Sequence, residues 1–409
     1  MKIQGLETFT VAPPNGIGGA YWLLLRVTTD DGIRGIGECY GIPFAPAVAE
    51  RMVHDLFERF FLNADPHAIE TLFRRCYSTG FTQRPDVSLM GVFSGIEMAL
   101  WDILGKACNQ PVYNLLGGAF HERLRTYSYI YPPGLDAVPG EPVDGDVYHD
   151  GEAAAKRAMD YVKAGFTAVK QDPAGPYTMQ GGRELSLYEQ QRSVDSLQAL
   201  RAAVGVDADL LFGTHGQMTT ASAIRLAKQL EPFDPLWFEE PCPPDQLASL
   251  ASIASATSIP VATGERLTTR VEFHAALQAG VRILQPDIGR SGGIWETKKI
   301  AALAELYNAQ VAPHIYCGPV AHAAAAHVAF SSPSFLILET ILTDFHSQVV
   351  DSHVIWDSGY LLTPAVPGLG LELNDTVIAA NPVTDSAALH LEMCQSALSS
   401  DNRLKISEL

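Results

Sequence analysis

Short apolar runs alternate with amphipathic segments over the middle of the chain, from about residue 125 to residue 340. An apolar run between turn signals is typical of a buried strand, whereas a longer segment with apolar positions three and four residues apart is typical of a helix. The segments 220–231 and 294–308 show the helical pattern. The apolar runs predict eight strands, at residues 125–131, 168–173, 209–215, 236–241, 260–266, 283–289, 310–315 and 335–340.

This alternation of strands and helices implies crossover connections, and crossover connections produce a parallel sheet. Eight such units match a closed (β/α)8 barrel, the TIM barrel. An open doubly wound sheet is the competing architecture, but no glycine-rich phosphate turn follows the first strand to support dinucleotide binding. The fold class predicted here is therefore α/β, with a modified (β/α)8 barrel. The loop at 131–152, rich in proline, glycine and aspartate, is long enough to suggest a functional or mobile segment.

The two ends of the chain have different patterns. Residues 2–12 and 20–29 are β-rich, a turn is expected at Asp31-Gly32, and helical patterns follow at about 45–61, 66–79 and 88–108. Proline and glycine interrupt the pattern at 110–118, where we expect a domain boundary. The resulting prediction is an N-terminal α+β domain at 1–120, a barrel at 121–350, and a C-terminal segment at 351–409 that returns to the first domain.

Composition and charge narrow the class of protein. The 409 residues are 47% hydrophobic and 18% charged, which is enough apolar material for a large core. The formal net charge of −18 argues against nucleic acid or an anionic membrane as the main partner, because both require clustered positive charge. The six cysteines form no C-x-x-C pair, and the sequence shows neither a signal-peptide core nor a run of 18 apolar residues. A cytoplasmic protein is expected.

Ionisable residues stand at the ends of seven successive predicted strands. After the first gap, they are 22 to 27 residues apart, about one β/α unit each. Any one of them alone is more often a helix cap or a core residue with its polar atoms satisfied. The carboxyl ends of barrel strands, however, converge on one pocket, and burying so many charges together is costly unless they bind a metal or a charged ligand. The seven are Lys170, His215, Glu239, Glu265, Asp287, His314 and Glu339.

These residue types favour particular chemistry. Glu239 and Glu265, on adjacent strands, are the carboxylate donors of a hard-cation site and suit Mg²⁺. Asp287 and His314, on the next two strands, suit a dyad in which the carboxylate fixes the imidazole tautomer and raises its basicity. Lys170 would face the pocket as a cation or proton donor. Glu339 would hydrogen-bond the substrate or the far side of the ion.

With these residues in place, the sequence resembles the enolase superfamily, and within it the mandelate racemase and sugar-acid (galactonate-type) dehydratase branch. The resemblance covers essentially the whole chain. It implies an N-terminal α+β capping domain over a modified (β/α)8 barrel, one Mg²⁺ and a first step that removes the proton α to a carboxylate. The motifs are WDILGKACNQPVYNLLGG (101–118), FEEP (238–241), TGER (263–266), QPDIGRSGGI (285–294), APHIYCGP (312–319), LET (338–340) and PGLGLEL (367–373).

The resemblance also implies roles by position. Glu239 and Glu265 match the second and third metal ligands of the family. His314 with Asp287 matches its general base, and Glu339 matches the carboxyl group that stabilises the enediolate. Lys170 matches the first lysine of the K-x-K pattern on the second strand.

Two positions depart from the family pattern. Asp172 stands where K-x-K has its second lysine, which disfavours a racemase with two bases. Gly213 stands where the family has its first metal ligand, an aspartate. His215, two residues further, is expected on the same side of the strand. It resembles the general acid that expels a β-hydroxyl group in sugar-acid dehydratases. Alternatively, it reaches the metal, or its role is structural.

The activity expected from this resemblance is dehydration of a sugar acid, a small-molecule carboxylate. A cycloisomerase of a sugar-acid lactone or anhydro sugar acid is the first alternative, and a non-catalytic scaffold or sensor is the second. Homo-oligomers are common in the family, and one is expected here. Specificity is expected from the cap loops 11–22 and 39–46, where Tyr21, Trp22, Tyr40 and Phe44 either line the mouth of the pocket or form ordinary cap core.

Overall fold

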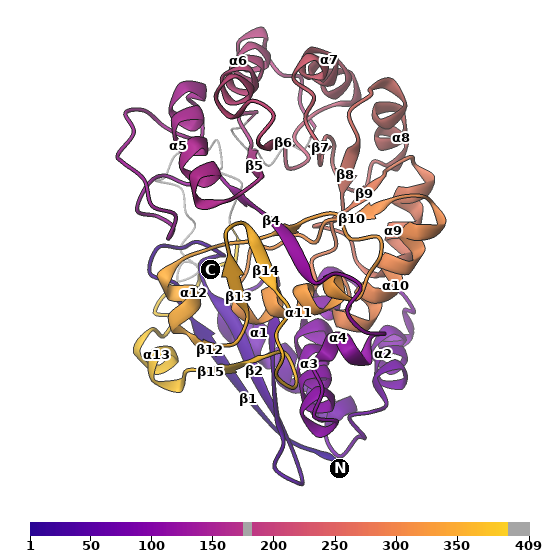
Figure 1. Cartoon of the computed structure of the whole chain (residues 1–409). Coiled ribbons are helices and arrows are strands. Elements are labelled where there is room, and N and C mark those ends of the chain that lie inside the picture. The colour runs from indigo at the N-terminus through magenta and orange to yellow at the C-terminus, as the bar shows by residue number, and fades with distance from the viewer. Residues whose placement is uncertain (175–181, 392–409) are drawn as a thin grey trace, which may run out of the picture.

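The computed structural model describes residues 1–174 and 182–391. In the view of Figure 1, the N-terminal strands and helices form the lower part of the molecule, and the barrel strands with their helices form the upper part. Strands β1–β3 form an antiparallel sheet in sequence order, covered by helices. The elements of this part are β1 (Ile3–Val11), β2 (Trp22–Thr29), β3 (Arg34–Cys39), α1 (Pro46–Leu56), α2 (Ile69–Tyr77), α3 (Val87–Ala107) and α4 (Val112–Leu115).

The middle of the chain forms the predicted barrel. Strands β4 to β10 are parallel and lie in sequence order, and β11 pairs with β4 in parallel. Val311 of β10 closes the remaining gap, because its N–H donates to Ser334 O at 2.8 Å and its carbonyl accepts from Leu336 N at 2.8 Å. The strands are β4 (Arg123–Tyr129), β5 (Ala168–Gln171), β6 (Asp209–Gly213), β7 (Trp237–Glu239), β8 (Val261–Thr263), β9 (Ile283–Leu284), β10 (Gln310–Val311) and β11 (Leu338–Glu339).

Helices surround the strands and confirm the (β/α)8 architecture (Figure 1). Capping side chains fix where several of them begin. Asp150 accepts from Glu152 N and Ala153 N, and Ser186 with Glu189 forms a capping box. The helices are α5 (Gly151–Ala164), α6 (Leu187–Val204), α7 (Thr220–Leu230), α8 (Leu247–Ala256), α9 (Thr269–Gln278), α10 (Gly293–Leu306) and α11 (Pro319–Phe330).

Several barrel strands end earlier than their apolar runs predicted. The prediction of a strand at 283–289 is wrong beyond β9, which ends at Leu284, and the prediction at 310–315 is wrong beyond β10, which ends at Val311. Pro286 and Pro313 follow these strands closely, and proline has no N–H to donate to a ladder. The regular ladder therefore ends there, and beyond it the two backbones pair at an isolated parallel bridge between Asp287 and His314.

The inside of the barrel is filled by one layer of large and small side chains. Ala168, Leu211, Trp237 and Ile337 lie two positions before Lys170, Gly213, Glu239 and Glu339 on their strands, so they point to the same side one level deeper. This apolar layer forms the floor on which the polar residues stand. Its members are Tyr127, Ala168, Leu211, Trp237, Ala262, Ile283, Ala312 and Ile337.

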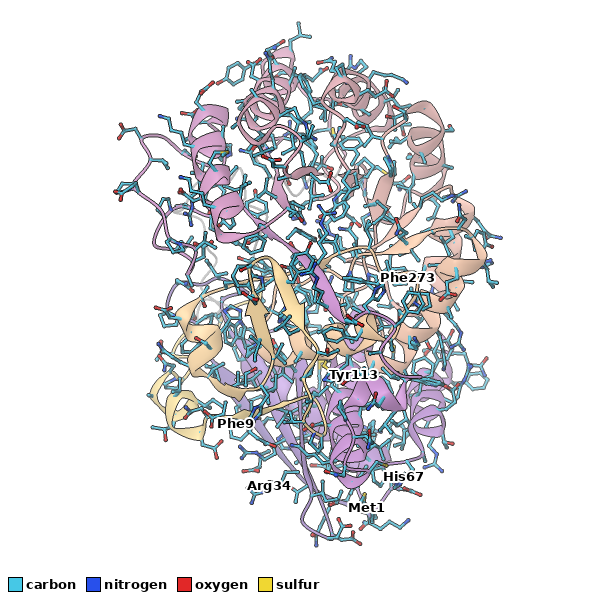
Figure 2. All side chains as sticks on the ribbon, in the orientation of Figure 1. Met1, Phe9, Arg34, His67, Tyr113 and Phe273 are labelled. Atoms are coloured by element: carbon cyan, nitrogen blue, oxygen red, sulfur yellow. The ribbon has the colours of Figure 1, made fainter. Side chains whose placement is uncertain are left out.

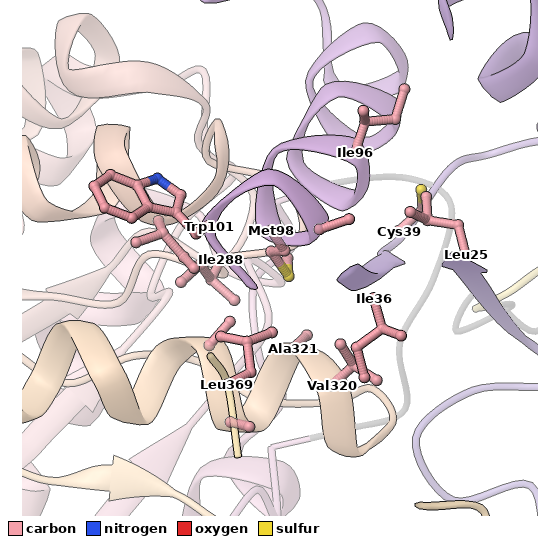
Figure 3. Packing of buried hydrophobic residues seen from close by; sticks show 14 of the residues in the cluster. Leu25, Ile36, Cys39, Ile96, Met98, Trp101, Ile288, Val320, Ala321 and Leu369 are labelled. Atoms are coloured by element: carbon pink, nitrogen blue, oxygen red, sulfur yellow. The ribbon is translucent and has the colours of Figure 1, made fainter. Parts of the chain in front are cut away.

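Helix α3 is the centre of the N-terminal domain. It approaches the sheet closely because Gly37 has no side chain: a Cβ atom there would lie 1.9 Å from Gly95 O. By length and composition α3 could cross a membrane, but 83% of its most apolar window is buried inside the protein. Figure 3 shows side chains of α3 and the neighbouring strands packed against Ile288, Val320 and Leu369, so one apolar core joins both domains.

Two buried carboxylates attach the N-terminal domain to the barrel. Glu38, at the end of β3, accepts from the N–H groups of Gly318, Val320 and Ala321 at the start of α11. Glu97 of α3 accepts from Ile294 N at 2.7 Å and Trp295 N at 2.9 Å at the start of α10. Helix N-termini carry partial positive charge and unpaired N–H groups, so each carboxylate binds where it is stabilised. Burial nevertheless raises the pKa of Glu38 to about 7 and that of Glu97 to about 8.

The C-terminal segment contacts both domains. Strand β14 pairs antiparallel with the first half of β4, and β12 pairs with β15. Further along, Asp375 forms an ion pair with Arg26 of β2, and Asn381 O accepts from Ala12 N at 3.0 Å. The elements are α12 (Asp344–Gln348), β12 (Val350–Ser352), β13 (Ile355–Asp357), β14 (Tyr360–Leu362), β15 (Leu371–Leu373) and α13 (Asp375–Ala380).

The burial of the His327 imidazole predicts that the folded protein loses stability in acid. His327 is buried in α11, where Nδ1 accepts from Tyr113 N at 3.1 Å and Nε2 lies 3.1 Å from Leu369 O, so one tautomer satisfies both contacts (Tyr113 is labelled in Figure 2). Burial lowers the pKa of His327 to about 4. Below about pH 6.5 this histidine therefore binds a proton in the unfolded chain but not in the folded protein. The free energy of unfolding falls as a result by about 1.4 kcal/mol per pH unit between pH 6.5 and 4.

We expect the free energy of unfolding of His327→Gln to fall less steeply than that of wild type over this pH range. Urea unfolding at several pH values between 7 and 4.5 measures both slopes. The comparison cancels the opposite contributions of Glu38 and Glu97, whose raised pKa values are common to both proteins. Parallel curves for the two proteins would contradict the assignment of a neutral, buried His327.

Candidate active site

The structure brings all seven predicted side chains to the carboxyl end of the barrel, and the place that they surround is called the hollow here. Lys170, Glu239 and Glu339 lie at or next to the last residue of their strands, and the others lie two or three residues beyond theirs. His215 is partly buried, and the remaining six are buried, with Glu265 the most exposed of them at 7%. The hollow therefore holds a concentration of charge that water does not screen.

Lys170 lies between two of the carboxylates. Its Nζ contacts Glu239 Oε1 and lies 3.6 Å from Glu339 Oε1. Burial alone would lower the pKa of this ammonium group, but the two carboxylates outweigh burial and hold the pKa well above its ordinary value. Lys170 is therefore a fixed cation at neutral pH.

Both glutamates are held rigidly by further donors. Glu239 Oε2 accepts from Trp237 Nε1 at 2.8 Å and from Gln285 Nε2 at 2.7 Å. Glu339 Oε2 accepts from Ile315 N at 2.9 Å. Because each carboxylate is fixed by groups of the barrel itself, its orientation toward the hollow is set before any ligand binds.

His314 and Asp287 form the predicted dyad. His314 Nδ1 lies 2.8 Å from Asp287 Oδ2, and Asp287 Oδ1 accepts from Gly289 N at 2.9 Å. Since an ionised carboxylate only accepts, Nδ1 carries the proton, and Nε2 is left toward the hollow. Burial would lower the pKa of His314, but the hydrogen bond to Asp287 and the charge of Glu265 raise it to about 9.

Glu265 has the least satisfied carboxylate of the group. Its Oε2 is buried, has no hydrogen-bond partner and lies 3.6 Å from His314 Nε2. On its other side, Oε1 lies 3.5 Å from Arg266 Nε. Burial would raise the pKa of Glu265, but the charges of His215 and His314 outweigh it and hold the pKa well below its ordinary value. An ionised oxygen with no donor, in a buried position, is suited to a bound cation.

His215 reaches the hollow by a route that differs from the prediction. Strand β6 ends at Gly213, and His215 has a left-handed backbone with φ of 49°. Strand alternation therefore does not extend to His215, because the chain has already turned, but its imidazole still lies on the side that Gly213 faces, since a Cβ atom on Gly213 would be 3.6 Å from Asp172 Oδ2. His215 Nδ1 lies 2.6 Å from the same oxygen, so the residue after β5 fixes the imidazole.

Gly213 lies in a crowded place. A Cβ atom there would be 3.3 Å from Lys170 Cε, 3.5 Å from Asp172 Cβ and 3.6 Å from Asp172 Oδ2. The space in front of Gly213 is thus taken by two side chains from the neighbouring strand and the residue after it.

The cap contributes one aromatic side chain to this hollow. The ring centroid of Tyr40 lies 5.6 Å from that of His314, and Arg290 stacks over Tyr40 with its Cζ 4.8 Å from the ring centroid. The other three predicted mouth residues lie elsewhere. Tyr21 and Trp22 are buried, Trp22 against Phe345 and His346 of the C-terminal segment, and Phe44 is 43% exposed.

Sequence reasoning missed several residues that shape the site. Trp237 and Gln285 each precede a predicted site residue by two positions, so the period-2 alternation of a strand could have identified them. Asp172 was read only as a missing lysine, and its contact with His215 joins residues far apart in the sequence. Residues 175–181, which follow Asp172 closely in the sequence, lie outside the described residues.

The donor set fits Mg²⁺ held by two carboxylates. Within residues 1–174 and 182–391, no three histidine, cysteine or acidic side chains already converge as a metal cage. Mg²⁺, however, commonly takes one or two carboxylates and completes its shell with water and substrate oxygens. Glu239 and Glu265 supply such oxygens, and the unpartnered Oε2 of Glu265 is the observation that supports the fit.

Comparisons with known proteins agree with this geometry. Curated relatives include the D-galactonate dehydratase of Ralstonia pickettii (strain 12J), which is 33% identical over 391 residues, covering 92% of this chain and 94% of the relative. Among solved structures, a putative mandelate racemase/muconate lactonizing enzyme from Burkholderia SAR-1 is 53% identical with a TM-score of 0.92, covering 97% of each chain. A mandelate racemase/muconate lactonizing enzyme-like protein from Roseovarius sp. TM1035 is 49% identical with a TM-score of 0.93, covering 97% of this chain and 99% of that one.

Family models cover both parts of the chain. The N-terminal domain of the mandelate racemase/muconate lactonizing enzymes matches residues 14–117, and the enolase C-terminal domain-like model matches residues 153–377. The two matches correspond to the antiparallel sheet with its helices and to the barrel. From its fold, its site and these relatives, the chain is an enzyme of the enolase superfamily and belongs to its mandelate racemase/muconate lactonizing enzyme family.

Proposed function

We propose that this enzyme dehydrates a sugar acid, removing the proton α to the carboxylate and the hydroxyl group on the neighbouring carbon. The observation that carries the proposal is the His314–Asp287 dyad, which faces the same hollow as the fixed cation Lys170. A proton beside a carboxylate is very weakly acidic, so its removal requires both a base within reach and positive charge where the negative charge develops. The hollow offers both.

The first half of the reaction uses His314 as the base. His314 acts in its neutral form, which the raised pKa makes the minor form at neutral pH: its Nε2 takes the α-proton, while Asp287 accepts from Nδ1–H and stabilises the imidazolium that forms. Lys170 would donate hydrogen bonds to the carboxylate oxygens as the enediolate forms, with Glu339 beside it. Mg²⁺ held by Glu239 and Glu265 would add positive charge to this region when bound.

The second half expels the hydroxyl group. We propose His215 as the acid that gives a proton to the leaving oxygen, because its ring follows β6 and that of His314 follows β10, across the barrel. The product would be a 2-keto-3-deoxy acid, formed when the enol tautomerises. A metal-ligating role for His215 has less support, since its Nδ1 is already bound to Asp172.

D-galactonate is the first substrate to test, because it is the substrate that the curated relatives' names give. Identity to these relatives is only 33–36%, so a panel of C5 and C6 sugar acids and their lactones belongs in the same experiment. Formation of a 2-keto-3-deoxy acid, detected by its semicarbazone absorbance and by mass loss of one water, supports the proposal. A product isomeric with its substrate contradicts it.

Such an isomeric product would support the second candidate, a cycloisomerase of a sugar-acid lactone or anhydro sugar acid. The departures at Asp172 and Gly213 favour keeping this candidate, because both alter groups that face the hollow. The non-catalytic scaffold loses its support, since the relatives are enzymes. A cytoplasmic location and a homo-oligomeric assembly stay predictions.

Gly213→Asp tests how the site holds its metal. We expect the single substitution not to tighten Mg²⁺ binding, because the new side chain meets Lys170 and Asp172 in a space where overpacking costs about 1–3 kcal/mol. The Asp172→Ser substitution makes room for the new side chain. The double variant Gly213→Asp/Asp172→Ser should therefore bind Mg²⁺ at least about tenfold more tightly than the single variant Asp172→Ser, since an added carboxylate raises affinity for a hard cation. Isothermal titration with Mg²⁺ measures both; tightening by Gly213→Asp alone would contradict the crowding.

A further inference from the structure

We propose that Asp172 is the positioning residue of a second carboxylate–imidazole dyad, Asp172–His215, which delivers the proton to the leaving hydroxyl group. This inference rests on the proposed function and assigns to Asp172 a role that the sequence reading did not. The contact that carries it is the 2.6 Å distance between His215 Nδ1 and Asp172 Oδ2, with the Asp172 side chain fully buried.

The two dyads lie on opposite sides of the hollow. In the eight-stranded ring, His215 follows β6 and His314 follows β10, so they stand four strands apart. On the β10 side, His314 Nε2 lies 3.6 Å from Glu265 Oε2. A substrate between them therefore has an imidazole on each face, one with Asp287 and one with Asp172 behind it.

The backbone around His215 is built to hold this arrangement. His215 has φ of 49°, a left-handed conformation that costs free energy for a residue with a side chain. Thr214 Oγ1 donates to Glu239 O at 2.9 Å and to Glu240 O at 2.6 Å, and Gly216 N donates to Glu240 O at 2.6 Å. The turn is thus tied on both sides of His215 to the end of the next strand.

The chemistry follows from the proton positions. An ionised Asp172 accepts from Nδ1–H, so Nδ1 keeps its proton in both states of the ring and Nε2 is the atom that exchanges one. Nε2–H of the imidazolium gives its proton to the β-oxygen, the C–O bond breaks with its electron pair going to that oxygen, and water leaves. The protons balance, because His314 gains the α-proton that the substrate loses while His215 gives up the proton that leaves in the water.

The experiment compares two matched substitutions, Asp172→Asn and Asp287→Asn, each of which removes the carboxylate behind one imidazole. Both enzymes are incubated with Mg²⁺ and the sugar acid that wild type dehydrates, in deuterium oxide, and two quantities are followed. One is formation of the 2-keto-3-deoxy acid. The other is the deuterium content at C2 of the recovered substrate, which reports that the α-proton was removed and that C2 then took up deuterium from the solvent.

For Asp172→Asn we expect dehydration to fall by about a hundred- to a thousandfold, the range typical of losing acid catalysis. Deuterium should meanwhile appear at C2 of the recovered substrate, because the His314 side still removes the proton. For Asp287→Asn both quantities should fall together. Equal loss of dehydration and exchange in Asp172→Asn would overturn the proposal, since it would indicate general damage to the site.

A leaving group that needs no proton provides a second readout. The probe is a substrate analogue with fluorine in place of the β-hydroxyl group. Wild type and Asp172→Asn should release fluoride from it at rates that differ by less than about tenfold, since fluoride departs with less acid assistance. Loss of fluoride that is reduced as severely as loss of water would contradict the assignment.

A spectroscopic signal separates this proposal from the proposed function. With ¹⁵N-labelled histidine, the proton shared between His215 Nδ1 and Asp172 should give a far-downfield resonance that disappears in His215→Asn and Asp172→Asn and returns in Asp172→Glu. If wild type dehydrates no sugar acid but this resonance is present, the function is wrong and the dyad stands. If the resonance is absent from wild type, the dyad itself is wrong.

Discussion

Replacing His314 by asparagine is expected to abolish measurable exchange of the substrate's α-proton, with a rate loss of about a hundred- to ten-thousandfold. Asparagine is smaller than histidine, but its amide nitrogen takes the place of Nδ1 and can still donate a hydrogen bond to Asp287, whereas it cannot take up a proton near neutral pH. The loss should therefore be in the chemical step, with kcat falling and KM nearly unchanged. Proton exchange at C2 in deuterium oxide measures it directly.

A matched histidine substitution shows whether the effect is specific. His274 lies on the outer helix α9, where Nε2 contacts Tyr307 OH at 2.8 Å, away from the hollow. His274→Asn should leave exchange unchanged, and circular dichroism should show both variants folded. If His314→Asn exchanges the α-proton at the wild-type rate, another residue is the base.

Replacing Arg157 by methionine is expected to cost about 3–5 kcal/mol of folding free energy, the effect of removing one partner from a buried ion pair. Arg157 has no exposed surface and lies 2.7 Å from Asp136 Oδ1, whose side chain is also buried. Its guanidinium also donates to the carbonyl groups of Tyr131 and Val138 at 2.9 and 2.8 Å. Methionine fills the volume but leaves these acceptors and the Asp136 charge buried without their donor.

Urea unfolding measures this cost, and an exposed ion pair provides the control. Arg59 and Asp55 form a pair on the surface, with 62% and 45% of their side chains exposed. Arg59→Met should cost far less than Arg157→Met, since water screens such a pair. Similar midpoints for the two variants would mean that the buried network is not a major stabilising feature.

The Arg157 network also shows where the sequence was a poor guide to order. The composition of 131–152 suggested a mobile or functional loop. In the structure, the part of it from Tyr131 to Val138 is fixed to α5 by Arg157, while Tyr161 OH contacts Asp136. Nothing in the local sequence indicates this, because the arginine lies 21 residues beyond its aspartate partner.

The barrel and the ring of charged residues could be predicted because both depend on local pattern. Apolar runs at regular spacing locate the strands, and the residue at the end of each run then falls on one rim. What the pattern could not provide is the exact path of the chain after each strand. At β6 the chain turns through a left-handed residue, and at β9 a proline ends the ladder, so His215 and Asp287 reach the hollow from loops.

Contacts between residues far apart in the sequence were the part that could not be predicted. The pairing of Asp172 with His215 joins the ends of two strands, and neither residue's neighbours indicate it. The same holds for Tyr40, whose position against His314 depends on how the N-terminal domain sits on the barrel. Resemblance to a family supplied roles only where this chain keeps the family's residues, and the unusual positions Asp172 and Gly213 required the structure.

The attachment of Glu38 and Glu97 to the starts of two barrel helices restricts how a substrate can reach the catalytic centre. Tilting the domains apart would pull both carboxyl groups from five backbone N–H donors at once and leave helix ends unsatisfied in an apolar seam. Hinge opening between the domains is therefore unfavourable, and a substrate route that keeps this joint intact is favoured over one that opens it.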